Sequence, residues 1–156
     1  MIFRTHIAFA FLIGLFFYFN FPLVNNFILF FLFLFLGAGF SDIDHNKSKF
    51  GRNFFSRIIT FFSKHRTIFH SLFFGVILTY LLFRFNRDSG IGFFLGFLSH
   101  IISDSFTKQG INFFYPFEKF TFSGFIKTGS FLETILFYFF VAACAVLLWN
   151  NLSQSF

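Results

Sequence analysis

Two residues near the end of an apolar segment have the spacing of a metal-ligand pair. His100 and Asp104 are four residues apart in the segment SHIISD. On a helix, their side chains therefore lie about 40° apart on one face and one turn from each other. An ionisable side chain buried beside lipid is costly without a partner, so a functional role is the default interpretation. The pair indicates a shared divalent cation.

Further histidines and acids gather in short clusters, although the chain has only five histidines and six carboxylates. In SDIDH, Asp42 and His45 are three residues apart, and Asp44 is either a further ligand or a partner that orients a histidine. In HRTIFHS, His65 and His70 are five residues apart and would diverge on an ideal helix. We therefore expect one of these two histidines to precede the helix.

The candidate metal ligands outnumber what one ion needs. They are His6, Asp42, Asp44, His45, His65, His70, His100 and Asp104. For His6 taken alone, a solvated or hydrogen-bonded imidazole is the simpler interpretation. A catalytic zinc takes three protein ligands and a water, so eight candidate ligands favour two or more ions. Two ions can stabilise both the attacking and the leaving oxygen when a phosphoester is displaced. Because Cys144 is the single cysteine, nitrogen and oxygen must supply the ligands. We predict zinc, with manganese or iron as alternatives.

The elements that position these residues are apolar. The chain is 56% hydrophobic and 12% charged, with a mean hydropathy of +0.76, and a soluble domain of this size could not bury so much apolar surface. Five apolar segments are expected to be helices: Ile7–Phe19, Phe27–Phe40, Leu72–Phe83, Ile91–Ile102 and Phe131–Trp149. The last is long enough to span a bilayer, and the others reach that length only with flanking residues. The sequence predicts an all-α integral membrane bundle in one domain, residues 1–156.

Three features between and within these segments bear on their packing. Apolar and polar residues alternate with helical periodicity over residues 50–64, which predicts an amphipathic helix at the membrane interface. Residues 105–128 are rich in aromatic side chains and are expected to form an ordered loop at the membrane surface. Gly92 and Gly96 continue the His100–Asp104 face, where small residues allow a neighbouring helix to approach closely.

If successive segments alternate in direction, all the clusters fall on one side of the membrane. Ten of the twelve basic residues fall on that side as well, which predicts that the site faces the cytoplasm of a multi-pass cell-membrane protein. The same residues could simply anchor loops to headgroups. Because the bilayer accounts for the net charge of +6, we expect anionic lipid as a partner and no nucleic acid.

Three residues are candidates for catalysis rather than metal binding alone. They are Asp44, Arg66 and Glu133. Arg66 could instead anchor the chain at the interface. Glu133 begins the last segment, where a carboxylate is a general base, a metal ligand or a helix cap. The residues themselves leave these alternatives open.

Several motifs occur in an order that resembles a known family. They are TH at residues 5–6, GAGFSDIDH at 37–45, HRTIFHS at 65–71, GFLSHIISDSFTKQG at 96–110, Pro116, and GSFLE at 129–133. This set resembles the YdjM-like family of membrane-bound metal-dependent hydrolases and is more distantly similar to zinc-dependent phospholipases C. The resemblance implies hydrolysis at a metal site formed by the eight candidate ligands named above.

Our hypothesis is a hydrolase acting on a phosphoester of a lipid or lipid-linked molecule. A metal or ion transporter is the main alternative, and it predicts ionisable residues near the bilayer midplane. The centres of all five segments carry no charge. A non-catalytic membrane adaptor is the third alternative, and it explains poorly why histidines and acids converge on one side.

Overall fold

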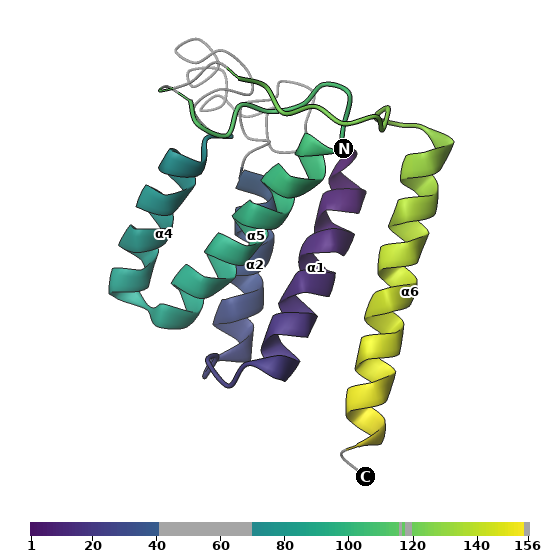
Figure 1. Cartoon of the computed structure of the whole chain (residues 1–156). Helices are drawn as coiled ribbons and strands as arrows, with labels where there is room; N and C mark the ends of the chain where they lie inside the picture. The colour runs from purple at the N-terminus through teal and green to yellow at the C-terminus, as the bar shows by residue number, and fades with distance from the viewer. Residues whose placement is uncertain (41–69, 116, 118–119, 155–156) are drawn as a thin grey trace, which may run out of the picture.

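The computed structural model describes residues 1–40, 70–115, 117 and 120–154, which form five helices and no strand (Figure 1). The helices are α1 (Phe3–Asn20), α2 (Phe27–Phe40), α4 (Leu72–Phe85), α5 (Arg87–Ser105) and α6 (Phe131–Ser153). Each predicted apolar segment is a helix, and the prediction of an all-α bundle is confirmed. The predicted interfacial helix over residues 50–64 lies outside the described residues.

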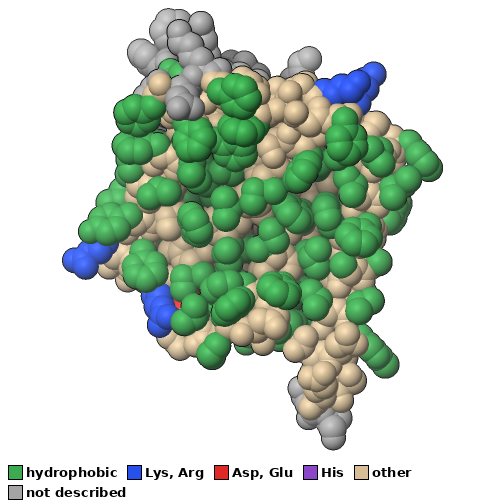
Figure 2. All heavy atoms as spheres, in the orientation of Figure 1, with side chains coloured by type: hydrophobic (Ala, Val, Ile, Leu, Met, Phe, Trp, Pro, Cys, Tyr) green, Lys and Arg blue, Asp and Glu red, His purple; other side chains and the backbone are tan. Residues whose placement is uncertain are grey.

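Two of these helices, α1 and α6, are long and apolar enough to cross a membrane, whereas α2 and α4 are apolar but shorter. Helix α1 begins four residues before its predicted segment, and α5 extends its segment at both ends. The exterior is largely hydrophobic: apolar side chains cover the face shown in Figure 2, with Lys and Arg at its margins. Such an exterior suits a lipid environment better than water.

The five described helices alternate in direction along the chain, which is the condition that we assumed for the sequence clusters (Figure 1). The first residues of α1, α4 and α6 and the last residues of α2 and α5 therefore meet at one end of the bundle, which we call the site end. Helix α5 packs mainly against α2 and also contacts α1 and α4, whereas α6 packs against α1 alone among the described helices. Helix α5 is thus the central element of the bundle.

The closest helix contact, between α2 and α5, depends on the predicted glycine stripe. A Cβ atom on Gly92 would lie 2.2 Å from the carbonyl oxygen of Phe30, and one on Gly96 would lie 1.9 Å from that of Leu34. Both distances are far below van der Waals contact, and the neighbouring atoms are backbone that cannot rotate away. The stripe therefore lets the two backbones touch, and any larger residue would push the helices apart.

At the end opposite to the site end, Asp88 in the first turn of α5 fixes the start of α2. Its carboxylate is buried and accepts hydrogen bonds from the backbone N–H groups of Asn25, at 3.2 Å, and Asn26, at 2.7 Å. The N–H groups at a helix start lack intrahelical acceptors, and a negative charge is favourable there. The α2–α5 pair is thus held along its length by glycine contacts and at one end by this carboxylate.

At the site end, the described residues between α5 and α6 are 106–115, 117 and 120–130, and they form a loop. Two isolated bridges, Thr107 with Ile126 and Ile111 with Phe122, fold it back on itself. Its exposed aromatic residues are Phe106, Phe114, Phe117, Phe120, Phe122 and Phe125. That these side chains enter the membrane surface stays a prediction.

Thr107 and Gly110 follow the last turn of α5. Thr107 Oγ1 donates to the carbonyl oxygen of Asp104 at 2.7 Å, and Gly110 has a φ of 62°. Both are features of the turn that ends α5.

Candidate metal centre

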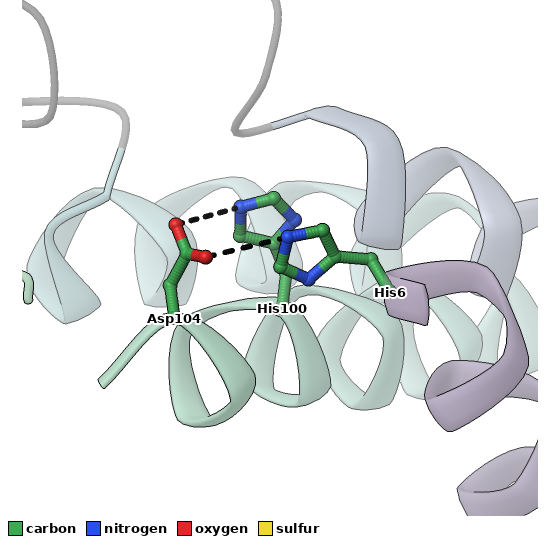
Figure 3. Close-up of side chains that lie close together, drawn as sticks. All are labelled: His6, His100 and Asp104. Carbon is green, nitrogen blue, oxygen red and sulfur yellow. Dashed lines mark ion pairs between the residues drawn. The ribbon is translucent and has the colours of Figure 1, made fainter. Parts of the chain in front are cut away.

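The His100 and Asp104 side chains lie on one buried face of α5, and His6 of α1 joins them (Figure 3). His6 Nε2 is 3.3 Å from Asp104 Oδ1, and His100 Nε2 is 3.8 Å from Asp104 Oδ2. The two imidazole rings stack with their centroids 4.0 Å apart and their planes 13° apart. One ligand atom from each of the three residues lies within 4.8 Å of the others. Residues 94 positions and more apart in the sequence thus meet at one point.

A backbone contact decides which nitrogen of His100 faces the carboxylate. His100 Nδ1 lies 2.7 Å from the carbonyl oxygen of Ala38. A carbonyl oxygen only accepts, so Nδ1 carries the hydrogen and Nε2 of the neutral ring presents a lone pair. Ala38 is in the last turn of α2, where carbonyl groups lack intrahelical donors. The end of α2 therefore orients His100 so that its Nε2 could act as a metal ligand.

A serine on α5 fixes His6 in the same way. His6 Nδ1 lies 2.6 Å from Ser103 Oγ, and that hydroxyl donates its hydrogen to the carbonyl oxygen of His100 at 2.8 Å. A hydroxyl has one hydrogen, so Ser103 must accept from His6 Nδ1–H. The Nε2 lone pair of His6 therefore also faces Asp104.

This arrangement fits a divalent cation. Two Nε2 lone pairs and a carboxylate converge in a site where each side chain is at most 1% exposed. Two imidazole lone pairs and a carboxylate that face one another repel, and burial strengthens the repulsion. A positive charge relieves it, and the Met1 ammonium at Asp104 Oδ1 supplies part of that charge. Imidazole ligands whose other nitrogen is held by a hydrogen bond are typical of metal sites in proteins. The buried group of His6, His100 and Asp104 could hold a metal ion.

His70 lies beside this group. Its ring is fully buried, its Nε2 is 3.8 Å from Asp104 Oδ2, and its centroid is 5.3 Å from that of His100. It stands just before Ser71, the N-cap residue of α4, as expected for one of the two histidines of HRTIFHS. The Met1 amino group also contacts Asp104 Oδ1.

The structure brings together four of the eight predicted ligands, namely His6, His70, His100 and Asp104. The other four, Asp42, Asp44, His45 and His65, lie outside the described residues, as does Arg66. Their roles stay predictions.

Glu133 makes the contacts of a helix cap. Its Oε2 accepts from the Gly129 N–H at 2.6 Å, and its Oε1 accepts from the Ile2 N–H. Its own N–H donates to Oγ of Ser130, the N-cap residue of α6. Through Ile2 the carboxylate also ties the start of α1 to α6, four residues before His6. A catalytic role for Glu133 stays a prediction.

Ser103 is a residue of the candidate site that the sequence did not single out. It lies within SHIISD, but serine is common near helix ends and its spacing alone carries no signal. Its position three residues after His100 places it on the same helix face, which is the one feature that could have marked it. The partner on α1 becomes visible only in the folded chain.

We expect Ser103→Ala to weaken metal binding about 10- to 100-fold, the usual cost of losing a partner that orients a histidine ligand. Ser105→Ala is the matched control. Like Ser103, Ser105 donates its hydroxyl hydrogen to the carbonyl oxygen three residues earlier, here that of Ile102, but it lies on a different face of α5. Competition with a chromogenic chelator measures both affinities. Equal affinities in the two variants would show that His6 does not depend on Ser103.

Comparisons with known proteins agree with the membrane character of this bundle. The sequence matches the family described as YdjM inner membrane protein over residues 1–155. It is also 35% identical over 106 residues to the uncharacterized protein YvsG of Bacillus subtilis (strain 168), a match that covers 65% of this chain and 66% of that protein. No solved structure matches this chain. The chain belongs to the YdjM inner membrane protein family.

Proposed function

We propose that this protein is a membrane-bound, metal-dependent hydrolase that cleaves a phosphoester of a lipid or lipid-linked molecule. The observation that carries the proposal is the buried His6–His100–Asp104 group at the end of an apolar helix bundle. Two imidazoles and one carboxylate are the ligand set of many catalytic zinc sites, which keep a further position for water or substrate. Zinc is the proposed metal, with manganese or iron as alternatives.

When bound, the ion would supply Lewis acidity to a phosphoryl oxygen and to water. The protein groups do the rest. His6, His100 and Asp104 hold the ion, and Ser103 and the Ala38 carbonyl fix the two rings so that the ligand geometry exists before substrate arrives. Burial of all three ligands excludes bulk water and strengthens electrostatic interactions with a phosphate.

A second ion is part of the proposal. His70 lies beside the described group, and Asp42, Asp44, His45 and His65 supply further nitrogen and oxygen ligands. Two ions would hold both the attacking and the leaving oxygen. In this scheme Asp44, Arg66 and Glu133 are the candidates for proton transfer and phosphate contact.

The proposed orientation places the site at the cytoplasmic face. The excess of basic residues in the segments next to the site end supports it, because cytoplasmic loops of membrane proteins are enriched in Lys and Arg. These residues would also attract anionic headgroups.

The position of the cluster favours hydrolysis over transport. The described ligand candidates lie near the site ends of α1 and α5 and just before α4, and the central turns of the five described helices contain no Asp, Glu, Lys or Arg. Transporters place their coupling sites near the bilayer midplane. A site at the helix ends is suited to a reaction at the headgroup level.

The test uses detergent-purified protein prepared without chelators. We expect one or more divalent ions per chain and metal-dependent release of phosphate or headgroup from a panel of glycerophospholipids and lipid-linked phosphates. His100→Ala should abolish both. Bound metal without cleavage of any phosphoester would refute the proposal that the substrate is a phosphoester. Metal uptake into proteoliposomes would favour the alternative that the protein is a transporter. A folded protein that binds no metal would refute the metal-dependent hydrolase and favour the non-catalytic membrane adaptor.

A further inference from the structure

An apolar groove lies directly beside the metal centre. It has a volume of about 360 Å³ and is formed by Met1 and Phe9 on one wall, by Leu132, Leu136 and Phe140 of α6 on the other, and by Ser103 with the adjoining loop at the site end. We call it the α6 groove. Its volume is within the range of about 300–1,000 Å³ usual for small-molecule sites.

The wall of this groove is apolar. Ser103 has the one hydroxyl among its lining residues, and that hydroxyl is occupied by His6 and the His100 carbonyl. A polar ligand would lose its hydrogen bonds to water on entering and gain none from this wall. The groove therefore suits a hydrocarbon chain.

The groove is also open toward the surroundings of the bundle. Helix α6 packs against α1 and, among the described helices, against no other, so it stands at the edge beside α1 (Figure 1). The lining includes no residue of α2 or α4, so the groove lies on the outer side of the bundle, where a ligand could enter beside α6. In a membrane protein this side is occupied by lipid, and a lipid tail reaches it without passing through water.

The length of the groove matches one lipid leaflet. It extends from Leu132 to Phe140 along α6, eight residues or about 12 Å at 1.5 Å per residue. Half of a bilayer hydrocarbon core is about 15 Å. A tail lying parallel to the helices would thus occupy it from the headgroup level inward.

Two residues connect the groove to the metal centre. Ser103 lines the groove and hydrogen-bonds His6, and Met1 lines it while its amino group contacts Asp104. The end of a chain bound in the groove is therefore adjacent to the ligand group. We propose that the α6 groove binds one hydrocarbon tail of the lipid substrate and thereby places the headgroup phosphoester at the metal centre. The identity of the headgroup rests on the proposed function, but occupancy of the groove does not.

The experiment uses full-length protein in phosphatidylcholine nanodiscs that contain phosphatidic acid with a diazirine in one acyl chain. After photolysis, mass spectrometry locates the labelled peptides. Leu136→Trp fills the groove, and the adjacent Ile135→Trp is the matched control because Ile135 is 48% exposed on the outer face of α6. We expect groove labelling that saturates with phosphatidic acid content.

Leu136→Trp should lower this labelling about fivefold, equivalent to roughly 1 kcal/mol, while Ile135→Trp leaves it unchanged. Labelling that rises linearly with lipid content, or that Leu136→Trp does not reduce, would overturn the inference. His100→Ala separates the two proposals, because it removes a metal ligand and leaves the groove intact. Saturable labelling without any phosphoester cleavage would refute the hydrolase and retain the lipid-binding groove.

Discussion

Replacing Asp104 with Asn should weaken metal binding by more than about 100-fold, beyond the usual effect of losing a residue that only orients a ligand. Asp104 is the one carboxylate in the described ligand group, and its two oxygens face His6, His70 and His100 at 3.3 to 3.8 Å. The amide keeps the shape of the side chain but loses the charge that attracts the cation. Metal content per purified chain and chelator competition measure the effect.

Asp88→Asn is the control for this result, since Asp88 is the other buried aspartate of α5. Its carboxylate binds the backbone N–H groups of Asn25 and Asn26 at the opposite end of the helix. This variant should lower folding stability by about 1–2 kcal/mol and keep the metal. If Asp104→Asn retained metal at the wild-type level, or if both variants lost it alike, the assignment of the metal centre would be wrong.

Replacing Gly96 with Ala should destabilise the protein by about 2 kcal/mol or more, because overpacking typically costs 1–3 kcal/mol and here the obstacle is backbone. The new Cβ would lie 1.9 Å from the Leu34 carbonyl oxygen and 2.9 Å from the Ala38 nitrogen. Helices α2 and α5 must separate to relieve this contact. Since Ala38 also accepts from His100, the separation should weaken metal binding as well. Reversible unfolding in mixed micelles gives the stability change.

Gly14→Ala is the matched control for the glycine contact. Its Cβ would meet the end of the Leu34 side chain at 2.6 Å, and a flexible side chain can move where a backbone carbonyl cannot. Alanine also favours the helix over glycine by up to about 1 kcal/mol, which offsets part of the cost. Equal destabilisation by Gly14→Ala and Gly96→Ala would show that the backbone contact between α2 and α5 tolerates a Cβ atom no less well than the side-chain contact at Gly14.

These predictions concern one helix with three separate tasks. Helix α5 binds the start of α2 through Asp88, packs against α2 through Gly92 and Gly96, and presents His100 and Asp104 at its other end. The packing of α5 on α2 therefore sets the position of the candidate metal ligands. A substitution in the apolar middle of the bundle should therefore alter metal binding at the site end.

Much of this arrangement was determined by the sequence alone. The apolar segments fixed the five described helices, because helix formation in an apolar chain follows from local composition and length. The four-residue spacing of His100 and Asp104 placed them on one face, and the same period placed Gly92 and Gly96 beneath them. Alternating helix direction then brought His6, His70, His100 and Asp104 to one end.

Only the tertiary structure decided how these residues meet. Three contacts depend on distances between segments far apart in the chain. Ser103 holds His6, the Ala38 carbonyl selects the His100 tautomer, and Glu133 binds the start of α1. The α6 groove likewise exists because α6 contacts α1 and leaves α5 free on that side. Sequence periodicity determines which face of a helix is apolar, but side-chain packing in three dimensions selects the neighbour of that face and its hydrogen-bond partners.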